Sequence, residues 1–135
     1  MGLKFGTEEW IKAYLEKLNA NKAYEESAKT WEGDFVFVIE PEGNLDHELR
    51  FYVDLWHGKA RSGKLLKPGE EVDSEFVFSG KWGNWEKLID GKLDPIKGLM
   101  ARKFKLKGDM KKVMRAVKAA KNLVKTIIMV DTEKY

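Results

Sequence analysis

The sequence predicts an α+β protein in which about five strands form a mainly antiparallel sheet and helices cover one face of that sheet. Three observations lead to this fold class. Strand-like apolar runs gather between residues 34 and 79, apolar residues at helical spacing occupy both ends of the chain, and tight turns separate consecutive strands, which gives antiparallel pairing. Amphipathic helices at both ends must bury their apolar faces, and the sheet offers the surface for this.

Two helices are expected before the first strand. Thr7 can cap a helix, and Glu8 and Glu9 suit its first turn. The apolar residues that follow fall on one helical face: Trp10, Ile11, Tyr14, Leu15 and Leu18. A second, short helix is expected over residues 24–31, ending near Gly33, because the helical spacing resumes there.

Four strands are expected next, at residues 34–40, 49–56, 59–66 and 72–79. The first is apolar on both sides, which indicates a central strand. In the second, apolar and polar residues alternate, so one side of it faces the core. The pair His57-Gly58 is typical of the turn that leads into the third strand.

The last third of the chain changes character. Two short helices and a fifth strand are expected there, at residues 82–90, 95–101 and 103–107. Asp94 caps the second of these helices, and Pro95 takes its first position. One long amphipathic helix is expected from Asp109 to Ile128. At about 100° per residue its apolar stripe is Met110, Val113, Met114, Val117, Ala120, Val124 and Ile128.

Composition describes a soluble globular protein with one domain over residues 1–135. No apolar run reaches the roughly 20 residues that cross a bilayer, and the first residues lack the apolar stretch of a secretory signal, so a cytoplasmic location is expected. The absence of cysteine excludes disulfides and thiolate metal sites. Glutamine is also absent while Lys and Glu are abundant, which favours a thermophilic source.

Positive charge is concentrated in one part of the chain. Residues 96–125 contain eleven Lys or Arg and one acidic residue, whereas the remainder contains 14 basic and 21 acidic residues. Two interpretations stay open. The basic part binds an anionic partner, such as a phosphate-bearing ligand, a membrane surface or nucleic acid, or it is a solvated lysine-rich helix face.

Enzyme activity is not expected. The two histidines, His47 and His57, fall at strand edges or turns, and Asp54 near His57 has no nucleophile beside it. Metal-ligand spacings and glycine-rich phosphate loops are missing, so neither a metal nor a cofactor is expected. Nucleic acid is not an expected partner either, because the basic strand over residues 103–107 has a single aromatic residue for stacking.

The methionines of the last third allow two interpretations. Met100, Met110 and Met114 either fill the core or line an apolar cavity, since methionine adapts its shape to varied apolar ligands. Short and long amphipathic helices that share one sheet face pack imperfectly, and a cavity can survive between them.

The run from Leu88 to Met110 resembles the signature of the sterol carrier protein 2 family. That signature is an amphipathic helix ending in Gly-Lys, then Asn/Asp-Pro, a short apolar helix, alternating Lys and apolar residues, and Gly-Asn/Asp-Met. Here the matching residues read Gly-Lys-Leu-Asp-Pro-Ile-Lys-Gly-Leu-Met-Ala-Arg-Lys-Phe-Lys-Leu-Lys-Gly-Asp-Met. The segments Val53-Asp-Leu, His57-Gly-Lys and Phe76-Val-Phe are also similar to strands of the family, and the resemblance covers residues 7–125.

The resemblance implies a five-stranded sheet covered by helices that enclose an apolar lipid tunnel. Family members bind fatty acids, acyl-CoA, sterols and other lipids, so it also implies non-catalytic lipid binding or transfer. The alternative is a structural, oligomerisation or protein-interaction module without lipid cargo. Ala101 and Arg102 stand where many relatives have Gln-Gly, so a polar group that could orient a lipid head group is missing.

Two sets of residues are expected to form the site. The residues expected to line the tunnel are Leu88, Ile89, Leu93, Ile96, Leu99, Met100, Phe104, Leu106, Met110 and Met114. The residues expected to meet an anionic head group or an anionic membrane surface are Lys103, Lys105, Lys111 and Arg115. The apolar segment over residues 126–130 has two expected placements: it closes the tunnel, or it packs on a second subunit in a homodimer.

Overall fold

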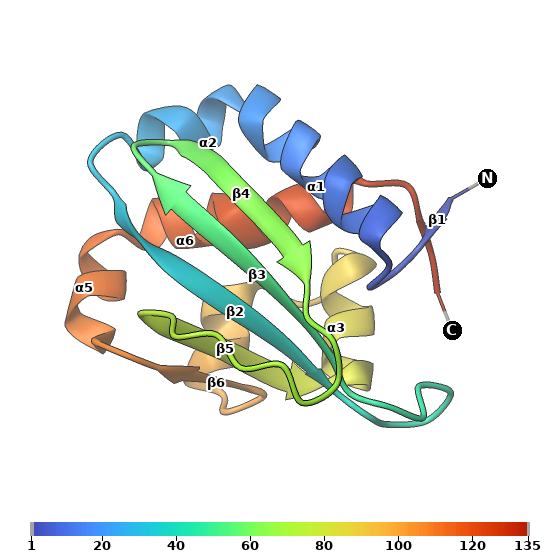
Figure 1. Ribbon diagram of the computed structural model, residues 1–135. Coiled ribbons are helices and arrows are strands. Elements are labelled where there is room, and N and C mark those ends of the chain that lie inside the picture. Colours follow the sequence, from blue (N-terminus) through green and yellow to red (C-terminus); the bar gives the residue numbers. More distant parts are fainter. Residues whose placement is uncertain (1, 135) are drawn as a thin grey trace.

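A five-stranded sheet carries helices on one of its faces in the computed structural model, which describes residues 2–134 (Figure 1). The strands are β2 (Glu32–Glu40), β3 (Leu49–Trp56), β4 (Lys59–Leu65), β5 (Phe76–Lys81) and β6 (Phe104–Lys107). Their order across the sheet is β4-β3-β2-β5-β6. The α+β class, the five strands and the one-sided helix layer are confirmed.

Antiparallel pairing dominates the sheet, as expected, and the central pair β2–β5 is parallel. The chain must cross from the edge strand β4 to the far side of β2 before β5 begins, and residues 66–75 make this connection (Figure 1). The expected start of the fourth strand at residue 72 is wrong. Pairing with β2 begins only at Phe76, opposite Phe35, because the preceding residues are still part of the crossover.

Two helices precede the sheet, α1 (Glu8–Ala20) and α2 (Lys22–Ser27), and the first is as expected. The expected bounds of the second helix, residues 24–31, are wrong. Helix α2 ends at Ser27 and β2 begins at Glu32, because Trp31 packs on rings of the sheet instead of continuing the helix. The Thr7 side chain accepts a hydrogen bond from the Trp10 amide and caps α1, and Asn21 caps α2 in the same way. Each cap satisfies an amide that has no partner inside its helix. The apolar face of α1 is buried against the sheet and the last helices: Trp10, Ile11, Tyr14 and Leu18.

The expected long helix over residues 109–128 is wrong. It divides into α5 (Met110–Arg115), α6 (Val117–Lys125) and the 3₁₀ helix η1 (Thr126–Met129). The break lies at Ala116, whose backbone angles of φ −121° and ψ 38° leave the helical region. The separate direction of α5 lets the Lys112 ammonium reach the Glu75 carboxylate at 2.7 Å and the Glu32 carbonyl.

Within the segment 126–130, Thr126, Ile127 and Val130 are buried in the core of the same chain, whereas Ile128 and Met129 are exposed. Thr126 and Ile127 of η1 have no exposed surface, and η1 contacts α1 and α3 (Trp82–Ile89). The chain then forms β7 (Thr132–Glu133), which pairs in parallel with β1 (Leu3–Lys4). The sequence pattern did not predict this two-stranded clasp between the two ends of the chain.

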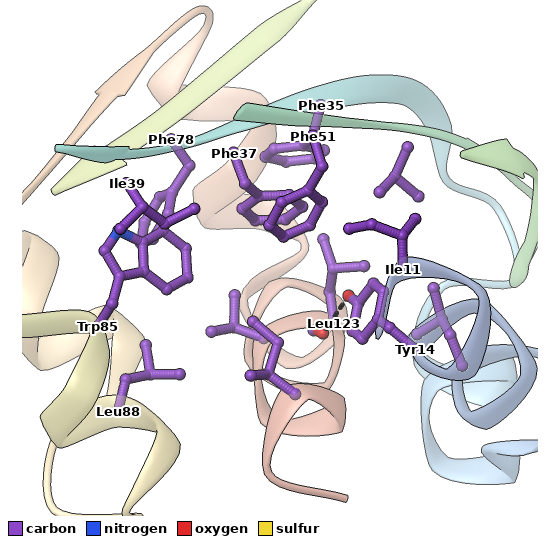
Figure 2. Close-up of a cluster of buried hydrophobic side chains, with 14 of the residues drawn as sticks. Ile11, Tyr14, Phe35, Phe37, Ile39, Phe51, Phe78, Trp85, Leu88 and Leu123 are labelled. Carbon is purple, nitrogen blue, oxygen red and sulfur yellow. Dashed lines mark hydrogen bonds between the residues drawn. The ribbon is translucent and has the colours of Figure 1, made fainter. Parts of the chain in front are cut away.

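Aromatic rings fill much of the core between the sheet and the helices. Phe35, Phe37 and Phe51 point from the sheet toward Trp85 of α3 and Tyr14 of α1 (Figure 2). Phe37 stacks on Phe51 with ring centroids 5.0 Å apart and meets Trp85 edge-on at 6.0 Å. Within residues 2–134, no helix is both long and apolar enough to cross a bilayer.

Candidate functional site

An apolar hollow lies between the inner face of the sheet and the helices α4 (Pro95–Met100), α5 and α6. Its volume is about 20 Å³, which leaves room for about one water molecule. Its lining is apolar throughout: Phe35, Phe37, Phe78, Pro95, Ile96, Leu99, Leu106, Val113, Ala120, Leu123 and Val124. This space is called the main hollow below.

A second, smaller hollow adjoins the main hollow beneath α6. Its volume is about 10 Å³, and its lining is Tyr24, Trp31, Phe35, Leu55, Ala119, Ala120 and Leu123. Phe35, Ala120 and Leu123 line both spaces and form the wall between them. The two hollows therefore form one incompletely filled apolar layer along α6.

Small side chains on α6 account for this incomplete filling. Ala119 and Ala120 face the rings of the sheet, where a leucine or phenylalanine would fill the layer. Native cores are packed to the density of organic crystals, so space lined only by apolar groups is unusual in a small domain. Such space, together with helices that can shift, is the ordinary setting for an apolar ligand.

Polar anchors hold α6 from the side of the N-terminal helices. The Tyr14 hydroxyl donates to the Leu123 carbonyl at 2.6 Å (Figure 2), and burial raises the pKa of Tyr14 well above its usual value. The Asn122 amide donates to the Ala23 carbonyl at 3.2 Å and to the Ser27 hydroxyl at 3.0 Å. Helix α6 meets the sheet through apolar contacts, which a ligand can replace.

Helix α4 forms the outer wall of the main hollow and is lightly held. The Asp94 carboxylate caps it by accepting from the Ile96 and Lys97 amides, and Lys121 of α6 lies 3.6 Å from the same carboxylate. Pro95 and Gly98 are its buried residues. A Cβ atom on Gly98 would lie 2.8 Å from the Phe104 ring, so α4 lies directly against that ring.

Three of the ten residues expected to line a tunnel line the main hollow: Ile96, Leu99 and Leu106. The other seven do not line it in this structure. Leu88 and Phe104 are buried in the aromatic core, and Ile89 and Leu93 pack on the outside of that core.

The expected methionines lie on the surface. Met100 is 74% exposed, Met110 41% and Met114 44%. The break at Ala116 explains the last two, because α5 turns Val113 toward the hollow and leaves its methionines outside. Met100 is the last residue of α4, where the chain turns away from the hollow.

Most of the lining residues were not among the expected site residues. Phe35, Phe37 and Phe78 fall within two of the expected strands, and Leu123 falls within the expected long helix, outside its named apolar stripe. The sequence signal for them was present, because all four sit on apolar faces. An apolar face on a strand or helix, however, does not show whether its residues border a hollow or lie in a filled core.

The four basic residues expected to meet an anionic group are exposed: Lys103, Lys105, Lys111 and Arg115. None of them lines the main hollow, and within residues 2–134 none forms an ion pair. Their charges are therefore available to a partner outside the chain.

Several polar groups that could support chemistry are engaged in local pairs. His57 lies 2.6 Å from the Glu32 carboxylate, while Asp54 pairs with Arg61 at 3.1 Å. The Tyr52 hydroxyl donates to Asp34 at 2.7 Å, and burial together with this bond raises the pKa of Tyr52 to about 12. Over residues 2–134, no cluster of three potential ligand side chains could hold a metal ion.

Comparison with known proteins agrees with this architecture. The model of the SCP-2 sterol transfer family matches residues 11–121. A crystal structure of sterol carrier protein 2 superposes with a TM-score of 0.85 at 32% identity, covering 94% of this chain and 99% of that chain.

Two further relatives extend the comparison. A solution structure from Thermus thermophilus, whose description suggests a sterol carrier protein, has a TM-score of 0.84 at 30% identity and covers 98% of this chain and 95% of that chain. Its source agrees with the thermophilic composition of the present chain. The hydroxysteroid dehydrogenase-like protein 2 of Xenopus tropicalis is 35% identical over 88 residues, which are 64% of this chain but 19% of that protein.

Proposed function

The chain belongs to the SCP-2 sterol transfer family, and on this basis we propose that it binds a long-chain apolar ligand, such as a fatty acid or acyl-CoA, beneath α6 and carries it without chemical change. Family membership supports lipid binding or transfer in general. We propose in addition that the ligand has an acyl chain and that this chain lies between α6 and the sheet.

One observation carries the proposal: the layer between α6 and the sheet is lined by apolar groups alone and is incompletely filled. The present volume holds about one water molecule, so an acyl chain requires α4 or α6 to move outward. Helix α4 suits this movement, because it has six residues and buries only Pro95 and Gly98.

The proposed ligand would first meet the residues that line the main hollow. Contact with the seven expected residues outside that lining stays a prediction. It requires that an outward movement of α4 and α5 opens a path past Met100, Met110 and Met114. A single domain over residues 1–135, a cytoplasmic setting and the absence of catalysis belong to the same proposal.

Titration of delipidated protein with a fluorescent fatty acid tests the proposal. Saturable binding near one ligand per chain is expected, and the variant Ala120→Leu should weaken it, because the added carbon atoms occupy both hollows. The variant Ala20→Leu is the matched control, since Ala20 is exposed at the end of α1. No saturation in the micromolar range, or equal affinity of both variants, would contradict the proposed site.

Native mass spectrometry of freshly purified protein separates the proposal from the alternative of an interaction module. A chain that carries one lipid mass supports the carrier. A homodimer free of lipid, with no uptake of added fatty acid, supports the module.

A further inference from the structure

We propose that the surface formed by residues 95–115 docks on anionic lipid membranes. This stretch includes α4, β6 and α5 and is called the α4–α5 surface. The proposal extends the proposed function, because these same elements wall the main hollow on their inner side. It concerns a distinct event, however, since docking needs no ligand in the hollow.

Charge is the first argument. The α4–α5 surface has eight basic residues and a single acidic one, Asp109. Lys112 is paired with Glu75 at 2.7 Å. Within the described part of the chain, the other seven form no ion pair: Lys97, Arg102, Lys103, Lys105, Lys107, Lys111 and Arg115. All seven are exposed, so their positive charges can attract an anionic partner outside the chain.

Exposed methionines are the second argument. Met100, Met110 and Met114 lie on the α4–α5 surface and are 74%, 41% and 44% exposed. Large apolar side chains among unpaired lysines are typical of surfaces that rest on the headgroup region, where the apolar groups enter the lipid and the cations stay with anionic headgroups. A nucleic acid would be attracted to the positive charges, but the exposed methionines could not stack on its bases, because stacking requires aromatic rings.

The outer face of α1 lacks these features. Its exposed charged residues are Glu8, Glu9, Lys12, Glu16 and Lys17. Three of these five are acidic, so an anionic surface gains nothing from this helix. The N-terminal helices are therefore expected to face away from the membrane.

The position of the α4–α5 surface relative to the main hollow gives docking a consequence. Ile96 and Leu99 of α4, Leu106 of β6 and Val113 of α5 line the hollow from within. The exposed methionine of α4 follows directly after Leu99 in the chain. Docking therefore brings the thin outer wall of the hollow against the lipid, on the side where an acyl chain would enter or leave.

Binding to vesicles tests the charge argument. Delipidated protein is sedimented with vesicles of phosphatidylcholine alone and with vesicles that contain about a third phosphatidylserine. Binding is expected only to the anionic vesicles and should weaken strongly near 1 M salt, where the Debye length is about 3 Å. A basic residue at an anionic surface adds up to about five-fold in affinity. The triple variant Lys103→Gln, Lys105→Gln, Lys111→Gln should therefore lose roughly ten-fold or more.

A second triple variant controls for net charge. Lys12→Gln, Lys17→Gln and Lys29→Gln remove the same number of exposed lysines from the N-terminal part, and these three form no ion pair with any residue of the described range 2–134. This control should bind the anionic vesicles nearly as well as the original chain. An equal loss in both variants would overturn the assignment to the α4–α5 surface, as would equal binding of the original chain to neutral vesicles.

The absence of cysteine permits a direct test of orientation. Met100→Cys and Met129→Cys each offer one thiol for an environment-sensitive fluorophore, and Met129, at 52% exposure, lies on η1 outside the proposed surface. A blue shift on anionic vesicles is expected for the label at position 100 and not at position 129. A shift at position 129 alone, or binding to a single-stranded oligonucleotide but not to vesicles, would refute the proposal. Fatty-acid binding without vesicle binding would refute docking and leave the carrier function intact.

Discussion

Replacement of Gly98 tests how α4 is seated. A glycine-to-alanine change inside a helix ordinarily stabilises it by about 1 kcal/mol. Here the new Cβ atom would lie 2.8 Å from Cδ2 and 3.0 Å from Cε2 of Phe104, whereas ordinary contacts begin near 3.4 Å. We therefore expect Gly98→Ala to lose stability despite the better helix propensity.

The Phe104 ring cannot move aside to accept the new methyl group. A Cβ atom on Gly80 would lie only 2.5 Å from the opposite side of the ring, so the ring fills a slot between two glycines. Phe78 stacks on the ring at 4.9 Å and Trp85 meets it edge-on at 5.3 Å. Helix α4 must move instead. Overpacking of this kind costs about 1–3 kcal/mol, which leaves a net loss of about 1 kcal/mol after the gain in propensity.

Urea denaturation followed by tryptophan fluorescence measures this loss in delipidated protein. In a Phe104→Leu background the same change should cost nothing or stabilise the protein, since the double-mutant cycle removes the contact that causes the strain. With saturating fatty acid the stability loss caused by Gly98→Ala should shrink, because the proposed ligand already displaces α4. By linkage, the Gly98→Ala variant should then bind the fatty acid several-fold more tightly than the original chain. A gain near 1 kcal/mol would refute the rigid slot, and a loss that is equal with and without ligand would refute the movement of α4.

Three further outcomes follow from the structure. Met100→Ala should change the free energy of unfolding of ligand-free protein by less than about 0.5 kcal/mol in urea denaturation, since the side chain is 74% exposed; a loss above about 2 kcal/mol would mean that it packs in the core. Tyr14→Phe should cost about 1–3 kcal/mol, because the buried Leu123 carbonyl loses its donor at 2.6 Å; thermal or urea unfolding measures this, and no loss would show that the bond is unimportant. Stability should fall as the pH rises from 10 toward 12, because Tyr14, Tyr24 and Tyr52 have pKa values raised above 10.0 in the folded chain, so the unfolded chain releases its tyrosine protons first. Denaturation curves across this range check the slope, which Tyr14→Phe should reduce and which should fade below about pH 9, where the unfolded chain keeps its tyrosine protons.

Local chemistry made much of the fold predictable. Thr7 and Asp94 were expected to be caps from their neighbours alone, and each side chain accepts from amides of the helix that it begins. A cap depends on residues within one turn, so the sequence contains the whole interaction. The alternation in β3 likewise depends only on which side faces the core.

The prediction of one long helix was wrong because the helical spacing of apolar residues gives no information about a change in the direction of the helix axis. The apolar arc over residues 110–128 was wide enough to fit one helix, and it fits two short helices of different direction equally well. The break at Ala116 has neither glycine nor proline to mark it. On the near side of the break, Lys112 contacts the Glu75 carboxylate and the Glu32 carbonyl, which lie far away in the sequence and are brought to α5 only by the folded chain.

The candidate site shows the same division. The sequence by itself determined that the segment from Leu88 to Met110 combines apolar faces with an excess of positive charge, because composition and spacing decide both. Only the tertiary structure decided which apolar side chains border free space. Phe104 fills a slot because Gly80 and Gly98 approach it from two sides, while Phe35 borders a hollow because Ala119 and Ala120 stand opposite. Each outcome depends on the sizes of residues brought together from separate elements, and that pairing exists only in the folded chain.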